Sequence, residues 1–308
     1  FLLPDGIVCL LLKKFTGLPY AITAHGSDVP GYNPHRFKLL HLLLKPAWRV
    51  VARNASVIVC PSAVIQDLVR TECPAARTKV IPNGIDPGRF TPDRPKKPRI
   101  LAVSRIVERK GVQYLIEALA GLDQPFELHV VGDGPYLPTL RELAAQRQVD
   151  VVFHGALPND SQELKDLYET SRIFAFVSTM ENFPLVLLEA MTAGCAIVTT
   201  SGTGCAEAVG NDAVLVPPAD VEATRQALVQ LMEDRDLCAA LGRNARARVE
   251  ERYSWDIVVR QYVDVLEGSF EVDPATVASL TSDRINAGPI CPTLGGRPDP
   301  ETAMRVKS

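Results

Sequence analysis

Between residues 99 and 216, short apolar runs alternate with segments of helical periodicity, and no other feature restricts the possible folds of this chain as strongly. The apolar runs predict strands at residues 99–104, 127–132, 151–154, 173–177, 196–200 and 213–216. Helices are predicted at residues 112–122, 137–148, 161–170 and 185–193, with two or three more between about 220 and 266. Apolar strands joined by helices of this length indicate a parallel sheet covered on both faces. We therefore expect an α/β domain that binds its ligand at the carboxyl ends of the strands.

A polar stretch with three prolines, residues 91–98, precedes this alternating region. Its composition is that of a linker, so we place a domain boundary near residue 95. The segment before the boundary carries two shorter strand predictions, at residues 20–24 and 56–60, with helical patterns between and after them. The sequence thus predicts one domain over residues 1–95 and a second over residues 96–267.

Charge and cysteine content narrow the function classes. A net charge of −3 over 308 residues gives no general reason to expect nucleic acid as a partner. The seven cysteines show no Cys-x-x-Cys pair and no zinc-like spacing, which favours reduced core thiols and a cytoplasmic location over disulfides.

The two ends of the chain differ from the middle. The chain begins with Phe1 rather than Met, inside a fold-like pattern, so we expect its true N-terminus to be missing and the first domain to be incomplete. Lys13 and Lys14 follow the apolar run at residues 10–12 at once, which argues against a membrane span or a signal peptide. Residues 268–308 are rich in Pro, Gly, Thr, Asp and Arg, and we expect this tail to be disordered.

Two acidic residues, Glu181 and Glu189, bracket the stretch that follows the predicted strand at residues 173–177. Pro184 suits the first turn of a helix, which places Glu181 in the strand-to-helix loop and Glu189 inside the helix. The backbone N–H groups near residues 183–185 would then point out of the helix start, where an anion is favoured. Carboxylates that accept hydroxyl hydrogen bonds on either side of a phosphate site suit a nucleotide sugar, which has sugars at both ends of a diphosphate.

Two basic residues, Arg105 and Lys110, come directly after the predicted strand at residues 99–104, and Gly111 opens the next helix. A guanidinium and an ammonium at the carboxyl end of a strand can hold a diphosphate and stabilise charge that develops on a phosphate leaving group. The alternative is a solvated basic loop.

Two further motifs have alternative interpretations. Residues 132–135 read Gly-Asp-Gly-Pro, but Leu137 stands where a dinucleotide fingerprint has its third glycine, so a tight turn close to a ligand is favoured over an NAD site. Residues 234–236 read Asp-Arg-Asp, a pair that could hold a divalent ion; their helical surroundings favour a helix N-cap, and no metal site is predicted.

The predicted strand at residues 20–24 ends at His25, which could face the cleft between the domains and contact a sugar hydroxyl or transfer a proton. Position alone favours a capping or core histidine.

Residues 36–53 form a helical segment with one basic stripe and a proline at position 46. Its basic residues are Arg36, Lys38, His41, Lys45, Arg49 and Arg53. Such a stripe can rest against anionic lipid or guide an anionic acceptor, and it can equally be a solvated face.

Taken in order, these motifs resemble those of retaining GT-B glycosyltransferases of family 4, the glycosyl transferases group 1. The matching segments are residues 82–86, 103–105 with 110–111, 131–135, 152–155 and, most fully, 181–194. The resemblance covers residues 20 to about 265 and implies two Rossmann-like domains that face a cleft.

The resemblance also implies roles for individual residues. Arg105 and Lys110 would bind the donor diphosphate, and Glu189 would bind the ribose hydroxyls. Glu181 would hold hydroxyls of the transferred sugar, and His25 would contact that sugar from the opposite domain. Backbone amides would help around Asn182, Phe183, Pro184 and Leu185.

The activity implied by the resemblance is transfer of a hexose-type sugar from a UDP- or GDP-sugar to a glycan or lipid-linked acceptor, with retention of anomeric configuration and without a metal or cofactor. The expected location is the cytoplasm, with peripheral contact to the inner face of the cell membrane through residues 36–53. Two alternatives stay open: a nucleotide-sugar epimerase of the same architecture, and a non-catalytic fragment that binds a nucleotide sugar.

Overall fold

The computed structural model describes residues 2, 4–32, 38–122 and 125–269, without the side chains of residues 38–42 and 269. Phe1–Ser269 form one compact unit. The tail predicted to be disordered lies almost entirely outside the described residues, since it begins at residue 268. Within the described ranges, no helix is both long enough and apolar enough to cross a membrane.

The larger sheet contains six parallel strands in the order β6-β5-β4-β7-β8-β9. Its strands are β4 (Lys97–Val103), β5 (Glu127–Val131), β6 (Val151–Gly155), β7 (Ser171–Phe176), β8 (Ala196–Thr200) and β9 (Val214–Val216). In chain order this is the doubly wound 3-2-1-4-5-6 arrangement of a Rossmann-like domain. The strand order reverses between β4 and β7, so the crevice expected to bind ligand opens at the carboxyl ends of these two strands.

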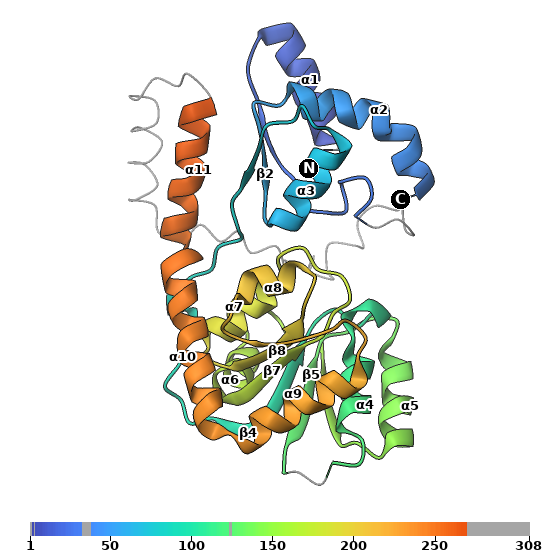
Figure 1. Cartoon of the computed structure of the whole chain (residues 1–308), viewed down its shortest axis with the longest axis vertical. Coiled ribbons are helices and arrows are strands. Elements are labelled where there is room, and N and C mark those ends of the chain that lie inside the picture. The colour runs from blue at the N-terminus through green and yellow to red at the C-terminus, as the bar shows by residue number, and fades with distance from the viewer. Residues whose placement is uncertain (1, 3, 33–37, 123–124, 270–308) are drawn as a thin grey trace, which may run out of the picture. The chain divides into compact units, whose positions relative to one another are not determined.

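Helices cover both faces of this sheet (Figure 1). Every residue of β7 is buried; Phe174 and Phe176 belong to one apolar cluster, whereas Ile173 and Ala175 belong to the other, as the alternation of a strand requires. The first cluster is covered by α6 (Gln162–Thr170), α7 (Leu185–Thr192), α8 (Gly204–Val209) and α10 (Arg235–Arg252). The second is covered by α4 (Val112–Leu119), α5 (Leu137–Arg147) and α9 (Val221–Glu233). Each large apolar side chain buried in this way contributes about 1.5–3 kcal/mol.

The smaller sheet has three parallel strands in the order β1-β2-β3. They are β1 (Ala21–Thr23), β2 (Val57–Cys60) and β3 (Thr78–Val80), and their helices are α1 (Asp5–Thr16), α2 (Lys38–Asn54) and α3 (Ala63–Glu72). Trp48, Ile58 and Ile65 lie in one buried cluster of this domain.

The last helix, α11 (Trp255–Ser269), returns to the smaller sheet. Its Val258 is 1% exposed and packs with Val59 of β2 and Ile81, on a cluster separate from that of α1 to α3. This helix, which follows the larger domain in the chain, therefore packs on a strand of the smaller sheet.

The predicted strands of the alternating region are all present, and the α/β fold with two Rossmann-like domains is confirmed. The linker prediction was wrong at one end, because Lys97 and Pro98 already belong to β4. The sequence interpretation also did not name α1, β3 or α8. The domain boundary near residue 95 stays a prediction.

Candidate functional site

Backbone contacts hold the loops after β4 and β7 together at the point where the strand order reverses. The 3₁₀ helix η2 (Glu108–Lys110) follows β4, and its Arg109 carbonyl accepts hydrogen bonds from Thr179 N at 2.9 Å and Ser178 Oγ at 3.0 Å. Gly111 has φ +78°, and a Cβ there would lie 2.2 Å from the Val177 carbonyl oxygen. Only glycine allows the backbone at position 111 to come this close to Val177. This close packing fixes the neighbouring Lys110 beside the loop after β7.

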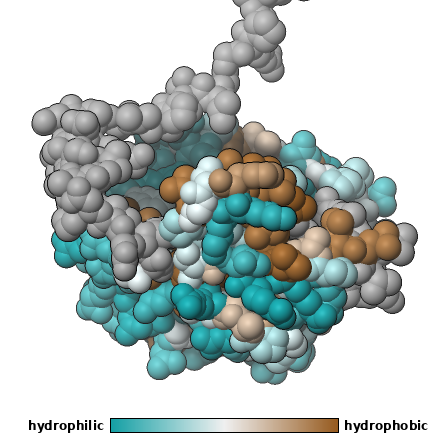
Figure 2. All heavy atoms as spheres, turned by 90° about the horizontal axis from the view of Figure 1, so that it is seen from above, coloured by the Kyte–Doolittle hydropathy of each residue, from teal (hydrophilic) through white to brown (hydrophobic). Residues whose placement is uncertain are grey.

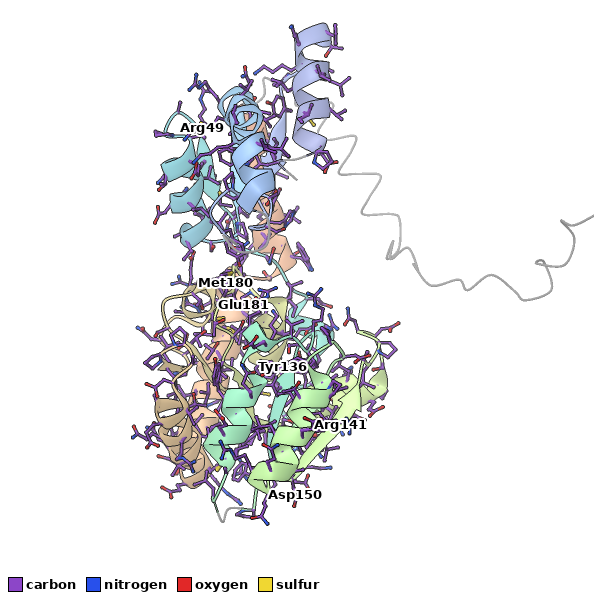
Figure 3. All side chains as sticks on the ribbon, turned by 90° about the vertical axis from the view of Figure 1, so that its right-hand side faces the viewer. Arg49, Tyr136, Arg141, Asp150, Met180 and Glu181 are labelled. Atoms are coloured by element: carbon purple, nitrogen blue, oxygen red, sulfur yellow. The ribbon has the colours of Figure 1, made fainter. Side chains whose placement is uncertain are left out.

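Lys110 and Glu181 form an ion pair in this loop cluster. Lys110 Nζ lies 2.6 Å from Glu181 Oε1, and the side chains are only 16% and 11% exposed. Ser178 Oγ donates to the same carboxylate oxygen at 2.6 Å, and the ammonium lies 5.1 Å from the Phe176 ring centroid. Since the bonds to the described residues all go to Oε1, Oε2 can accept a hydroxyl from a ligand. Figure 3 shows Glu181 at one end of the larger domain and Asp150 at the other.

Arg105 lies exposed in the loop after β4. Over the described part of the chain it makes no ion pair, so its guanidinium is available to an anion. The turn at residues 132–134 supports this loop: a Cβ at Gly132 would lie 1.8 Å from Ser104 O, and one at Gly134 would lie 2.2 Å from Ile106 O. The tight turn is present with its glycines against the Arg105 loop, and its closeness to a ligand stays a prediction.

The start of α7 differs slightly from the prediction. Pro184 is the N-cap (φ −76°, ψ 125°) rather than a residue of the first turn, and the helix begins at Leu185. Phe183 is 4% exposed with its ring edge-on to Tyr253, and Asn182 Oδ1 accepts a hydrogen bond from Ser62 Oγ at 2.8 Å. Residues 182 and 183 therefore use their side chains for structure, and the free N–H groups of the helix start are what this segment offers an anion.

Glu189 lies farther along α7 with partners of its own. Its Oε1 lies 3.1 Å from a guanidinium nitrogen of Arg89, in the 3₁₀ helix η1 (Pro87–Arg89), and its Oε2 accepts from Tyr168 Oη at 2.8 Å. Burial raises the pKa of Glu189, opposed by the charge of Arg89 and the Tyr168 hydrogen bond. Burial raises the pKa of Tyr168 well above its ordinary value, so this phenol stays a donor.

Two acids and two bases were expected to converge, and the structure brings only Lys110 and Glu181 into contact. Glu189 pairs instead with Arg89, which sequence reasoning missed. The available signal was that Arg89 follows the turn at residues 82–86, itself one of the family-like segments.

His25 follows β1 in an exposed loop, and its backbone N–H donates to Asp28 Oδ1 at 2.9 Å. Tyr32 belongs to the same loop: a Cβ at Gly26 would lie 3.0 Å from the Tyr32 ring. Burial, with a further contribution from the negative charge of Glu181, raises the pKa of Tyr32 to about 12. Tyr32 of this loop therefore lies within electrostatic reach of Glu181.

Other predicted features resolve as follows. Asp234 caps α10 by accepting from Leu237 N at 2.7 Å, as expected. The cysteines within the described ranges are free, and Cys291 lies outside them. Among the residues that the structure describes, no cluster of three or more His, Cys, Asp or Glu side chains could hold a metal ion.

Two Rossmann-like domains, with a cation–carboxylate pair at the switch point of the larger one, define a GT-B type of glycosyltransferase. The chain belongs to the glycosyl transferases group 1 family, whose model matches residues 89–248; the model of glycosyltransferase family 4 matches residues 1–89.

Relatives and solved structures agree with this assignment. The chain is 29% identical to a sulfoquinovosyl transferase of Arabidopsis thaliana over 80% of its own length and 51% of that protein's. It is 30% identical to a GDP-mannose-dependent phosphatidylinositol monomannoside mannosyltransferase of Mycobacterium tuberculosis, over 63% and 57% of the two lengths. The chain thus spans about half the length of these relatives.

The fold matches sucrose-phosphate synthase of Thermosynechococcus elongatus with a TM-score of 0.76 at 23% identity, over 87% of this chain and 72% of that one. It matches HepE of Anabaena, solved with UDP-glucose, with a TM-score of 0.73 at 21% identity, over 85% and 76%.

Proposed function

We propose that this protein transfers a hexose-type sugar from a nucleotide-sugar donor to a glycan or lipid-linked acceptor, with retention of anomeric configuration. The observation that carries the proposal is the Lys110–Glu181 pair at the switch point. Arg105 follows the same strand, and among the described residues it has no ion-pair partner. Family membership supports sugar transfer. A GDP-mannose-dependent relative and a structural neighbour solved with UDP-glucose support a GDP- or UDP-sugar as donor.

Each charged group of the site has a part in donor binding. Arg105 and Lys110 bind the diphosphate, with the N–H groups at the start of α7 as additional donors. Glu181 accepts hydroxyl hydrogen bonds from the transferred sugar through Oε2. Glu189 accepts from the ribose, because each of its oxygens keeps a lone pair after bonding Arg89 or Tyr168.

The proposed step needs no side-chain nucleophile. The bond between the anomeric carbon and the diphosphate oxygen breaks, and the bond from the acceptor oxygen to that carbon forms on the same face. The acceptor proton passes to the departing phosphate oxygen, whose developing charge Arg105 and Lys110 stabilise. His25, in the same loop as Tyr32, contacts the sugar from the smaller domain. No metal is required, because the cations of the chain neutralise the phosphate.

The test combines calorimetric titration of UDP, UDP-glucose and GDP-mannose with a nucleotide-release assay. Lys110→Met should weaken nucleotide affinity at least about tenfold, since a charged hydrogen bond is lost. Glu181→Gln should leave UDP affinity within about threefold and lower turnover about a hundredfold, because its contact is to the sugar. Lys97→Met, an exposed lysine at the other end of β4, is the matched control.

Full turnover in both site variants would refute the site. Binding by the wild-type chain without turnover supports the non-catalytic alternative, and release of an epimerised sugar supports the epimerase.

The proposal includes peripheral contact with an anionic membrane through residues 36–53. Part of the basic stripe is already neutralised, since the Glu72 carboxylate lies 2.7 Å from Lys45 Nζ and 3.6 Å from Arg49 Nη2. The side chains at positions 36, 38 and 41 lie outside the described residues. Apolar side chains nearby are exposed: Leu43 is 69% exposed on α2, and Phe15 is 82% exposed on α1.

Seen from the end of the molecule where α1 lies, apolar side chains gather in a patch bordered by hydrophilic ones (Figure 2). We expect the protein to sediment with phosphatidylglycerol vesicles and not with phosphatidylcholine vesicles. Combined Leu43→Ser and Phe15→Ser substitutions should reduce the bound fraction severalfold. Val64→Ser, an exposed apolar residue on α3, is the control. Equal sedimentation of wild type and the double variant would contradict a contact through these residues.

A further inference from the structure

A small hollow lies at the amino ends of β4 and β7, at the edge of the larger sheet opposite the Lys110–Glu181 pair. Its volume is about 200 Å³. Its lining residues are Lys96, Arg172, Gly194, Arg235, Cys238 and Ala239. Lys96 directly precedes β4, Arg172 is the second residue of β7, and Arg235 is the first residue of α10. Three of the six lining residues are cations, and none is an acid.

Arg172 is the most unusual of these residues, because its side chain is buried without a counter-charge. It is 9% exposed, and its guanidinium lies 5.1 Å from the ring centroid of Phe126. Within the described ranges it forms no hydrogen bond and no ion pair. None of its guanidinium nitrogens is fully buried without a partner, so these donors open onto the hollow, where an anion can pair with them.

Electrostatics point to an anion as that partner. Burial lowers the pKa of Arg172, and the positive charge of Arg235 lowers it further, so two guanidiniums repel each other across the hollow. Cys238 supplies no negative charge, because burial raises the pKa of its thiol to about 11. Arg235 has an acid on each side, and neither lines the hollow. Asp234 is occupied as the N-cap of α10, and Asp236 is exposed in the first turn of that helix.

Lys96 completes the arrangement. Its ammonium donates to the Ala193 carbonyl at 2.7 Å, which anchors the group at the rim and leaves further N–H donors for a ligand. Arg235 is exposed, so its guanidinium can reach a ligand in the hollow. The start of α10 adds the positive partial charge of a helix N-terminus.

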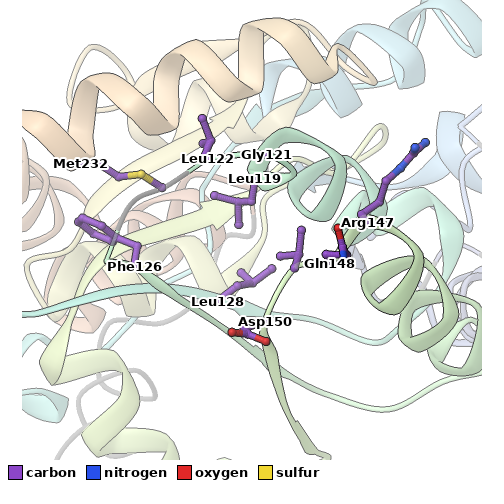
Figure 4. Close-up of a pocket in the computed structure, with 10 residues that line it drawn as sticks. Leu119, Gly121, Leu122, Phe126, Leu128, Arg147, Gln148, Asp150 and Met232 are labelled. Carbon is purple, nitrogen blue, oxygen red and sulfur yellow. The ribbon is translucent and has the colours of Figure 1, made fainter.

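Neighbouring hollows lack this combination. The one lined by Arg94, Arg243 and Arg246 also contains two acids, Asp93 and Glu250. Its Arg94 pairs with Asp166 and Glu169, and its Arg246 lies 2.9 Å from Glu250. Another, of about 300 Å³, is shown in Figure 4. Its Arg147 points away from the other labelled side chains and lies 3.6 Å from Glu117.

We propose that the hollow formed by Lys96, Arg172 and Arg235 binds a phosphate group, carried by inorganic phosphate or by a small phosphorylated metabolite. Two guanidiniums and an ammonium around one anion give the donors that a tetrahedral oxyanion accepts from. This site is separate from the donor site, because it lies at the opposite ends of the same strands.

The test is calorimetric titration of the whole chain with inorganic phosphate and with glucose 6-phosphate, at an ionic strength matched with chloride. Arg235→Gln should weaken phosphate binding about tenfold, and Arg172→Leu should weaken it further, because each removes a charged hydrogen-bond partner. Arg235 is exposed, so its replacement leaves the fold intact even if Arg172→Leu does not fold.

Two controls separate this site from other cations. Arg243→Gln removes the same charge from an exposed position of α10, and Lys110→Met removes the ammonium of the donor site. Both should leave the affinity of this site within about twofold. Tighter binding of glucose 6-phosphate would identify a metabolite, and equal binding would identify the free ion. Absence of phosphate binding in the wild type, or unchanged affinity in both Arg172→Leu and Arg235→Gln, would overturn the proposal.

Discussion

Single residues of α7 and its neighbours show how burial and pairing set the chemistry of this domain. Glu181 and Glu189 belong to one short segment, yet Glu181 binds a lysine and a serine, whereas Glu189 binds an arginine and a tyrosine. Burial raises the pKa of Glu189 in spite of its arginine. This carboxyl group therefore couples folding to pH.

We predict that Glu189 makes the protein less stable as pH rises. Its pKa in the folded state is above the ordinary value of 4.5, so the native state holds this proton more tightly than the unfolded state does. The contribution of protonated Glu189 to the free energy of unfolding is complete below about pH 4.5, and it is lost as pH rises through the pKa of Glu189 in the folded state.

Denaturant unfolding at several pH values from about 4.5 to 7 measures the effect. Glu189→Gln should remove this part of the pH dependence, whereas Glu251→Gln, at an exposed position of α10, should keep it. A Glu189→Gln protein with the pH dependence of the wild type would show that another group is responsible.

Among the elements, the loops at the carboxyl ends of the larger sheet depend most on glycine. Gly111, Gly132 and Gly134 each allow backbone approaches that a Cβ would block. The approaches at Gly132 and Gly134 hold the loop after β4 against the end of β5, and the approach at Gly111 holds the end of η2 against the end of β7. These glycines therefore position Arg105 and Lys110 without direct contact to a ligand.

Gly111→Ala should destabilise the protein by about 2 kcal/mol or more and weaken nucleotide binding, because strain at positive φ adds to a clash with Val177 O. Gly17→Ala is a matched control: φ is +77° there, but no atom lies within 4 Å of the added Cβ. It should cost about 1 kcal/mol and leave nucleotide affinity unchanged. Denaturant titration and UDP calorimetry measure the two effects. Equal losses in both proteins would mean that the close approach to β7 is unimportant.

Across the whole molecule, a few specific contacts join the two sheets. The Glu207 carboxylate of α8 accepts from Ala63 N, the first residue of α3, at 2.8 Å, and Asn83 Nδ2 donates to Phe183 O at 2.9 Å. Val258 of α11 adds an apolar contact to β2. A helix covering the smaller sheet is thus supplied by the C-terminal end of the larger domain.

Val258→Ala should lower the free energy of unfolding by about 1–3 kcal/mol, because Val258 is 1% exposed and little can refill its volume. Its neighbour Val259 is 51% exposed, so Val259→Ala should change the stability by less than about 0.5 kcal/mol. Fluorescence of the buried Trp48 reports unfolding of the smaller domain. Equal Trp48 transitions in both variants would show that α11 does not stabilise this domain.

The sequence predicted the larger domain well, because periodic apolar runs determine buried strands and the helices between them. It placed Lys110 and Glu181 at the same edge of that sheet, because both follow strands of the sheet, but it did not predict the ion pair between them. Arg89 and Tyr168 could not be predicted, because their contact with Glu189 depends on how η1 and α6 pack. The surroundings of Arg172 could not be predicted for a similar reason, because a single basic residue in an apolar strand does not indicate which residues of other elements lie next to it.

The chain passes between the two sheets at two places, and these places are hydrogen-bonded to each other. Ile85 N donates to Tyr253 O at 2.8 Å, and Trp255 N donates to Ile85 O at 3.2 Å. Because the two connections between the domains are hydrogen-bonded to each other, they can act as a single hinge. Any opening of the molecule should therefore be a hinge rotation about this point, a swing of one domain against the other, and not a shear motion. Such a swing would carry His25 toward or away from Glu181, and it would break the hydrogen bonds from Ser62 to Asn182 and from Ala63 to Glu207.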